Sequence, residues 1–290
     1  MSLAVAIVGA GWMGATHARA VAAAGDRVAR VIDPDGSKAD ALASAHDARG
    51  GDDMAAAGDC DAAIIATPSV AHRDQATELA GMGLPTLVEK PHRLPGQDPS
   101  ALLSAIAQTG APVRVGMTTR HHPGISRLKE ALASGALGRV LSWSDAYAFR
   151  ITPDLLSPWY FDPAHAGGGV LTTNGVHLID RAGWLLGKEL RAIGAHGLTP
   201  ICVGHQVEDH AHVRLMAGDV PVTLSLLWSE VSCPPPELTV IGTRGIARIG
   251  LDSWTIETTS GIDSGTLDDA EAGFAAQWRA FREVGARSGA

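Results

Sequence analysis

The chain opens on a short apolar run that ends in a glycine pattern. Residues 5–8 read Val-Ala-Ile-Val, and Gly9, Gly11 and Gly14 follow at G-x-G-x-x-G spacing. This order predicts a buried strand, a tight turn and the start of a helix. Gly9 permits the turn, Gly11 lets backbone approach a pyrophosphate, and Gly14 lets helix and strand pack closely. The phosphates would lie at the positive end of that helix. The pattern therefore predicts a dinucleotide site.

An acidic residue ends the next predicted strand. Asp33 follows the strand at 28–32 and lies about 20 residues beyond the glycines, where a carboxylate reaches the 2′-hydroxyl of a bound ribose. The alternative is an ordinary aspartate that caps a turn before Pro34. Asp33 favours NAD because a carboxylate repels a 2′-phosphate, whereas Ser37 and Lys38 nearby could hold that phosphate. We expect NAD, and NADP remains the alternative.

Composition narrows the class of protein. The 290 residues are enough for two domains, and hydrophobic residues make up 46% of the chain. A net charge of −8 with no basic block argues against a nucleic-acid partner. No apolar run approaches the ~20 residues that span a bilayer. The chain enters a strand directly, so we expect no leader peptide and a cytoplasmic protein.

Three cysteines, far apart and odd in number, suggest neither a disulfide framework nor a zinc pattern. They are Cys60, Cys202 and Cys233. Three histidines near one another, His205, His210 and His212, have no accompanying cysteine or carboxylate pattern. We therefore expect no metal site.

The order of apolar segments predicts two domains. Strands and helices alternate up to about residue 118, which indicates right-handed βαβ units and a parallel sheet. Longer alternating stretches follow, typical of an antiparallel sheet. We expect an α/β Rossmann domain over 1–118 and an α+β domain with a large, mainly antiparallel open sheet over 119–290. A terminal helix at about 274–284 could pack back on the first domain.

A second motif, Glu89-Lys90-Pro91, begins at the end of an apolar strand at 85–89. In an open parallel sheet, ligands collect at the carboxyl ends of strands, so Lys90 is placed to enter the cleft. An ammonium there can hold a substrate hydroxyl and stabilise charge developing on its oxygen. Taken alone, a lysine at a strand end is more often a solvated surface charge.

A third motif begins with three glycines at 167–169 and ends at His177-x-x-Asp180. The stretch 172–174, Thr-Thr-Asn, offers N-cap candidates for an amphipathic helix at about 176–186. His177 falls in the first turn, where the helix dipole favours the neutral imidazole that a general base requires. The alternative is a hydrogen-bonded structural histidine.

These motifs, in this order, resemble the glucose-fructose oxidoreductase / inositol 2-dehydrogenase / MocA (Gfo/Idh/MocA) family over nearly the whole chain. Ala66-Thr67-Pro68-x-x-x-His72 is similar to its third-strand loop, and Trp159-x-x-Asp162-Pro163 to part of its second-domain signature. The resemblance implies a nicotinamide-dependent oxidoreductase of sugars, polyols or related compounds, with oligomer contacts through the second sheet. We expect a homodimer or homotetramer.

The resemblance also implies site residues. The expected cofactor-binding residues are Gly9, Gly11, Trp12, Met13, Gly14, Asp33, Thr67, Pro68, His72, Glu89 and Lys90. The expected catalytic residues are Lys90, His177 and Thr173.

One position departs from the family pattern. The family has an aspartate four residues before the histidine, where this chain has Thr173. Threonine carries no charge near pH 7 and does not stabilise an imidazolium as a carboxylate does. Two rival functions follow: a cofactor-binding regulatory protein without turnover, and a reductase of C=N or conjugated C=C bonds. A zinc alcohol dehydrogenase is a fourth and weaker interpretation of the sequence.

Overall fold

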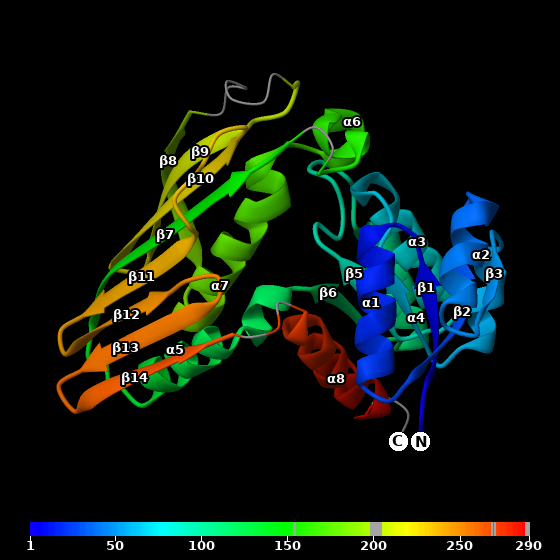
Figure 1. Cartoon of the computed structure of the whole chain (residues 1–290), viewed down its shortest axis with the longest axis horizontal. Helices are drawn as coiled ribbons and strands as arrows, with labels where there is room; N and C mark the ends of the chain where they lie inside the picture. The colour runs from blue at the N-terminus through cyan, green and yellow to red at the C-terminus, as the bar shows by residue number, and fades with distance from the viewer. Residues whose placement is uncertain (153–154, 198–204, 268, 270, 288–290) are drawn as a thin grey trace. The chain divides into compact units, whose positions relative to one another are not determined.

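The computed structural model describes residues 1–152, 155–197, 205–267, 269 and 271–287 (Figure 1). These residues form two compact units. One unit is Met1–Thr118 together with Glu271–Ala290, and the other is Thr119–Ala270. Each unit has its own sheet and its own core. No helix among the described residues is long and apolar enough to cross a membrane.

The first unit is built on a six-stranded parallel sheet with strand order β3-β2-β1-β4-β5-β6. Its strands are β1 (Ala4–Val8), β2 (Arg27–Ile32), β3 (Arg49–Gly51), β4 (Ala62–Ile65), β5 (Thr86–Glu89) and β6 (Val113–Gly116). Its helices are α1 (Trp12–Ala23), α2 (Gly36–Ser44), α3 (Ser69–Gly81), α4 (Ser100–Thr109) and α8 (Ala272–Arg287). The strand order reverses between β1 and β4, and in open α/β sheets a ligand crevice forms at such a switch point.

The parallel sheet is covered on both faces, which explains why its central strands read as unbroken apolar runs. All five residues of β1 and all four of β4 are buried. The C-terminal helix α8 contributes to one of the two cores with Trp278 and Phe281. Trp278 is fully buried, and its indole N–H donates to Asp26 at 2.8 Å. The last helix is therefore an integral part of the first unit.

The second unit contains an eight-stranded sheet with order β14-β13-β12-β11-β7-β10-β9-β8. Only β7 and β10 pair in parallel, and the other neighbours are antiparallel. The strands are β7 (Val140–Arg150), β8 (Leu190–His196), β9 (His210–Ala217), β10 (Val220–Ser229), β11 (Glu237–Gly242), β12 (Gly245–Ile249), β13 (Ser253–Thr258) and β14 (Gly261–Thr266). The helices are α5 (Pro123–Ala133), α6 (Pro163–Ala166) and α7 (Val176–Leu186).

The two faces of this sheet differ in chemistry. Helices α5 and α7 pack on one face, over a core that includes the fully buried Trp143 and Trp228. On the other face, Ser144 lies opposite Thr223 on one neighbouring strand and Thr239 on the other. At these positions, small polar side chains lie on the face that the helices leave uncovered, as the alternating sequence pattern predicts.

Candidate active site

The glycine turn between β1 and α1 has the geometry of a phosphate-binding loop. Gly9 has a φ of +99°, which side chains disfavour, and a Cβ at Gly14 would lie 1.9 Å from the Gly9 carbonyl oxygen. A Cβ at Gly11 would meet no atom within 4 Å, so this glycine faces open space. No side chain caps the first turn of α1. Its backbone N–H groups therefore suit a pyrophosphate, with Trp12, whose side chain is 72% exposed, and Met13 beside them.

Asp33 lies directly beside this turn. Its carboxylate accepts from the backbone N–H of Ala10 at 2.7 Å and from that of Asp35 at 2.9 Å. A carboxylate has about four acceptor sites, so these two bonds leave capacity for ribose hydroxyls. Asp33 therefore holds the turn in place, as the first alternative from the sequence expects. It also keeps free acceptor sites with which it could bind a ribose.

A second carboxylate stands at the end of β2. Asp35 caps helix α2 by accepting from the backbone N–H and hydroxyl of Ser37, and it forms an ion pair of 3.3 Å with Lys38. These hydrogen bonds, led by those from Ser37, lower the pKa of Asp35. Ser37 and Lys38, the two residues that could have held a 2′-phosphate, are therefore both engaged by the carboxylate of Asp35.

His72 joins two loops at the carboxyl edge of the parallel sheet. Its Nε2 lies 2.8 Å from the Thr67 carbonyl oxygen, and its Nδ1 lies 2.7 Å from the carbonyl oxygen of Pro91. The side chain is 1% exposed, and burial lowers its pKa, although the two carbonyl contacts oppose that shift. His72 thus ties the segment that contains Thr67 and Pro68 to the Lys90-Pro91 peptide, whose bond is cis.

Lys90 begins the loop that follows β5. Burial lowers the pKa of its ammonium, and the adjacent Glu89 carboxylate partly offsets this effect. Glu89 is itself buried: one carboxylate oxygen accepts from the Lys90 backbone N–H at 3.1 Å, and the other lies 2.8 Å from Nε2 of His17 in α1. The sequence left open that Lys90 is a solvated surface charge. The desolvation of its ammonium argues against that alternative.

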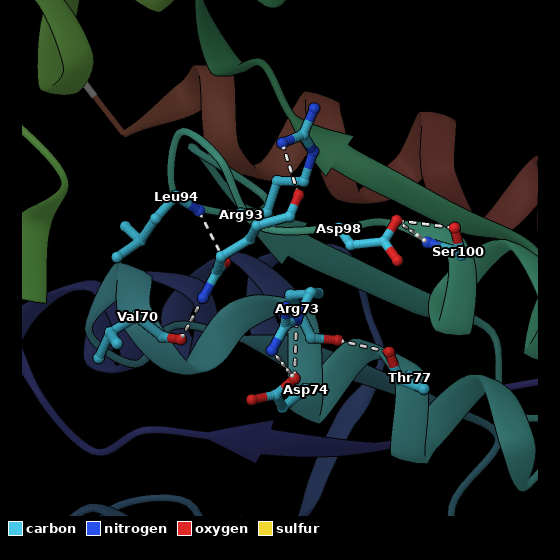
Figure 2. A network of polar contacts seen from close by, with 9 residues as sticks. Val70, Arg73, Asp74, Thr77, Arg93, Leu94, Asp98 and Ser100 are labelled. Atoms are coloured by element: carbon cyan, nitrogen blue, oxygen red, sulfur yellow. Dashed lines mark hydrogen bonds and ion pairs between the residues drawn. The ribbon is translucent and has the colours of Figure 1, made fainter.

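The segment after Lys90 is fixed to α3 by one glutamine, whose contacts with Leu94 and Val70 are drawn as dashed lines at those two labelled residues in Figure 2. Gln97 accepts from the Leu94 backbone N–H at 2.8 Å and donates to the Val70 carbonyl oxygen at 3.4 Å. Arg93 also donates to the Gln97 carbonyl oxygen at 2.9 Å. These bonds hold the loop that carries Lys90 against its neighbours.

In the second unit, a π-helical turn (Leu171–Gly175) leads without interruption into α7. The N-cap expectation for residues 172–174 is wrong, because the backbone at Val170 is already helical and no side chain of this stretch caps α7. Glu208 supplies the acceptors instead. Its carboxylate accepts from the backbone N–H groups of Gly169 at 2.7 Å and of Leu171 at 3.2 Å.

The polar side chains of α7 and its preceding turn have defined partners. Asp180 forms a bidentate ion pair with Arg120, with distances of 2.7 and 2.6 Å. Asn174 accepts from the indole N–H of the buried Trp228 at 2.9 Å. Asp180 and Asn174 are therefore engaged by partners within the second unit. Thr173 is 9% exposed, and His177 lies in the first turn of α7 as predicted.

The remaining candidates carry no metal-site geometry. His210 and His212 both lie in β9, and the ring of His205 stacks on Phe161 at 3.9 Å. Within the ranges that the structure covers, no group of three or more His, Cys, Asp or Glu side chains could hold a metal ion. Cys60 and Cys233 are free thiols, and Cys202 lies outside the described residues.

Sequence reasoning missed two residues of this site, His17 and Glu208. Each acts on a motif from a distance of many residues: His17 on Glu89 across 72 positions, and Glu208 on Gly169 across 39. Neither belongs to a short pattern. His17 is a polar residue in a largely apolar helix, whereas Glu208 lies in a polar segment, and neither signal names a partner.

Comparisons with known proteins agree with this geometry. Residues 3–117 match the family described as "Oxidoreductase family, NAD-binding Rossmann fold", and residues 125–248 match the "GFO/IDH/MocA C-terminal domain". Inositol 2-dehydrogenase 2 of Saccharopolyspora erythraea is 33% identical over 68% of this chain and 57% of its own length. Inositol 2-dehydrogenase of Streptomyces avermitilis is 34% identical over 89% of this chain and 75% of its own.

A solved structure supports the fold. Levoglucosan dehydrogenase in complex with NADH superimposes with a TM-score of 0.89 at 19% identity, covering 99% of this chain and 91% of that one. The matches to the first curated relatives cover 57% and 60% of those proteins.

Proposed function

Because this chain belongs to the Gfo/Idh/MocA oxidoreductase family, we propose that it is an NAD-dependent dehydrogenase of a polyol or sugar. The reaction moves hydride between a carbon–oxygen centre of the substrate and nicotinamide. Relatives named as inositol and levoglucosan dehydrogenases support this substrate class. The observation that carries the proposal is the half-buried Lys90 at the carboxyl end of β5, whose pKa is lowered by desolvation, in the unit that also holds the glycine turn.

The residues of the first unit fit NAD. The open space at Gly11, the uncapped N-terminus of α1 and the carboxylate of Asp33 suit the pyrophosphate and the ribose. NAD, when bound, supplies the hydride acceptor. Asp33 and Asp35, two carboxylates at the end of β2, favour NAD over NADP. Thr67 and Pro68 line the cofactor in this proposal, with His72 fixing their loop.

Lys90 and His177 are the proposed catalytic pair. In the oxidising direction, neutral His177 accepts the proton of the substrate hydroxyl, while Lys90 donates a hydrogen bond to the same oxygen and stabilises its developing negative charge. The proposal requires His177 to be neutral before it accepts this proton. Thr173, one helical turn earlier, contributes a hydrogen-bonding hydroxyl but no charge.

Substitution of the catalytic pair tests this proposal. We expect Lys90→Met and His177→Asn each to lower kcat for myo-inositol, or for the best substrate of a polyol and sugar panel, by at least about 100-fold. NADH binding, followed by fluorescence titration, should fall far less than kcat, because the glycine turn and Asp33, which hold the pyrophosphate and the ribose in this proposal, are unchanged. Unchanged turnover in a folded Lys90→Met variant would remove Lys90 from the mechanism.

Thr173 favours one rival, a regulatory protein that binds the cofactor but turns nothing over. Steady NADH binding with no turnover across polyols, sugars and keto acids would support that rival. A reductase of C=N or conjugated C=C bonds needs a proton donor but no help in deprotonating a hydroxyl. Product analysis with imine and enone substrates separates it from the dehydrogenase.

We also propose self-association through the uncovered face of the second sheet, as a homodimer or homotetramer. The small side chains there, such as Ser144 and Thr223, let two sheets approach closely. Light scattering on the purified protein, with Thr223→Arg as the disrupting variant, tests this assembly.

A cytoplasmic location is a further proposal, because the free thiols of Cys60 and Cys233 suit a reducing compartment. Cell fractionation tests it.

A further inference from the structure

A buried acid–histidine pair adjoins the proposed catalytic lysine within the first unit. His17 is 1% exposed and Glu89 is 5% exposed, and His17 Nε2 lies 2.8 Å from Glu89 Oε1. The second carboxylate oxygen, Oε2, accepts from the backbone N–H of Lys90 at 3.1 Å. One carboxylate therefore links α1, the helix that follows the glycine turn, to the backbone of Lys90.

The protonation pattern of the pair follows from donor and acceptor counting. An ionised carboxylate only accepts hydrogen bonds, so Nε2 of His17 carries the hydrogen of this contact. The other ring nitrogen, Nδ1, is buried and makes no hydrogen bond to any residue in the described part of the chain. Buried polar atoms are nearly always satisfied. A buried histidine kept with only one of its two nitrogens engaged points to a role for the nitrogen that is engaged.

The C-terminal helix closes over the same pair. Phe274 of α8 presents its ring edge-on to His17, with centroids 5.3 Å apart and planes at 88°. Gln277 of α8 is 4% exposed, and a Cβ at Gly116 would lie 3.3 Å from Glu89 Oε1 and 3.5 Å from Gln277 Nε2. Helix α1, strand β6 and helix α8, which are distant in sequence, thus surround the Glu89 carboxylate. Their packing excludes water from it.

We infer that His17 and Glu89 are positioning residues for Lys90: the pair fixes the lysine's backbone and keeps a negative charge next to its ammonium. This inference rests on the role of Lys90 in the proposed function. Neither side chain needs to touch the substrate. His17 holds the carboxylate in place, and the carboxylate acts on the lysine.

Charge explains why such a pair is useful. Burial lowers the pKa of Lys90 and so favours a neutral amine, which stabilises a developing oxyanion less well than an ammonium. Glu89 opposes that shift. Among the described residues of this unit, His72 interacts with the charge of Lys90, and burial lowers the pKa of His72. Burial also lowers the pKa of His92, two residues after Lys90 in the chain. Glu89 thus favours the protonated form of Lys90.

The chain offers a direct measurement, because it contains only four lysines: Lys38, Lys90, Lys129 and Lys188. Reductive methylation with ¹³C-formaldehyde labels each ammonium, and NMR follows each signal as the pH is raised. Lys90→Arg assigns the Lys90 signal by its disappearance. This readout uses the full chain without substrate and does not depend on turnover.

Three variants separate positioning from folding. Glu89→Gln removes the charge, His17→Leu removes the donor, and His17→Gln restores a side-chain N–H. We expect Glu89→Gln to lower the Lys90 titration midpoint by at least about half a pH unit, while Lys38, Lys129 and Lys188 keep theirs. We expect His17→Leu to lower kcat about tenfold with a smaller change in KM, and His17→Gln to recover most of that loss.

Two results would overturn the inference: a Lys90 midpoint unchanged in folded Glu89→Gln, or equal kcat values in His17→Leu, His17→Gln and wild type. Circular dichroism establishes that each variant is folded. If Glu89→Gln does not fold, the Lys90 midpoint in the two His17 variants decides instead, with a shift expected in His17→Leu alone. A wild type that oxidises no substrate refutes the proposed function, whereas the Lys90 midpoint still tests the pair.

Discussion

The carboxylate of Glu208 holds the backbone at Gly169, with Oε2 and the amide nitrogen 2.7 Å apart. The Glu208 carbonyl oxygen also accepts from Val170, and a Cβ at Gly169 would lie 1.9 Å from that oxygen. The acid therefore does for this turn what an N-cap side chain does for an ordinary helix. Because the turn leads into α7, Glu208 also fixes the start of the helix that carries His177.

We expect Glu208→Ala to lower the free energy of unfolding by about 1.5–3 kcal/mol, because hydrogen bonds to a charged acceptor are lost and the N–H groups remain. Glu208→Gln, which keeps one acceptor oxygen, should lose less. Urea denaturation measures both, and Glu230→Ala, at an exposed residue, is the matched control. Equal midpoints for Glu208→Ala and Glu230→Ala would contradict this role.

Short motifs made much of this molecule predictable. The glycine turn, the end of β5 at Glu89 and the start of α7 near His177 all lie where the residues indicated, because each depends on local backbone chemistry. The parallel sheet of the first unit and the mainly antiparallel sheet of the second also follow from the alternation of elements, whereas the strand orders do not.

What sequence could not supply is the identity of long-range polar partners. The local pattern at 172–174 suggested a side-chain cap, but the acceptor comes from Glu208, and Asn174 bonds Trp228 instead. Asp180 follows His177 by three residues, yet its two oxygens are engaged by Arg120. In each case the partner is set by tertiary packing, which spacing along the chain does not encode.

A pair of glycine substitutions separates folding from cofactor binding. Gly14→Ala places a Cβ 1.9 Å from the Gly9 carbonyl oxygen, so we expect a loss of roughly 1–3 kcal/mol in the unfolding free energy of the apo protein. Gly11→Ala meets open space, so its apo stability should match wild type, while the affinity for NADH falls at least about tenfold.

Thermal unfolding and fluorescence titration with NADH provide the two measurements. Gly36→Ala, also at an open position and at the start of α2, is the control for a helix-start glycine outside the cofactor turn. Full NADH affinity in Gly11→Ala would show that the pyrophosphate does not approach this backbone.

The buried His72 predicts how stability depends on pH. Burial lowers its pKa in the folded protein below the value of about 6.5 in the unfolded chain, so between those values the unfolded chain binds more protons. Its contribution to stability is complete above about pH 6.5 and is lost as the pH falls towards the folded pKa. His92, His121 and His122, whose pKa values are also lowered by burial, act in the same direction.

We expect urea midpoints to fall between pH 7.5 and 5.5, and to fall less in His72→Gln, which no longer titrates. His196→Gln, at an exposed position in β8, should keep the wild-type dependence. A His72→Gln variant with an unchanged pH dependence would show that His72 does not titrate differently in the folded and unfolded states.

Cofactor preference is expected to follow the charges at the end of β2. Wild type should bind NADH at least about tenfold more tightly than NADPH, because Asp33 and Asp35 repel a 2′-phosphate. Asp33→Asn should reduce this ratio, and Asp40→Asn, at an exposed residue of α2, should not. Titration with both reduced cofactors measures the ratio. An NADPH affinity equal to that of NADH in wild type would reassign the preference.

Thr173 gives the last prediction, on the chemistry of His177. An aspartate at this position, one helical turn before His177, places a carboxylate where it stabilises the imidazolium formed when a hydroxyl loses its proton. We expect Thr173→Asp to raise kcat/KM for polyol oxidation about tenfold and to move the acidic limb of its pH profile upwards, because a nearby anion raises the pKa of histidine. Thr173→Asn has nearly the same shape without the charge and should do neither. Because residue 173 is buried, thermal unfolding must first establish that both variants fold. Identical profiles for the Asp and Asn variants would mean that proton transfer at His177 does not limit the reaction, which would favour reduction of a C=N or C=C bond.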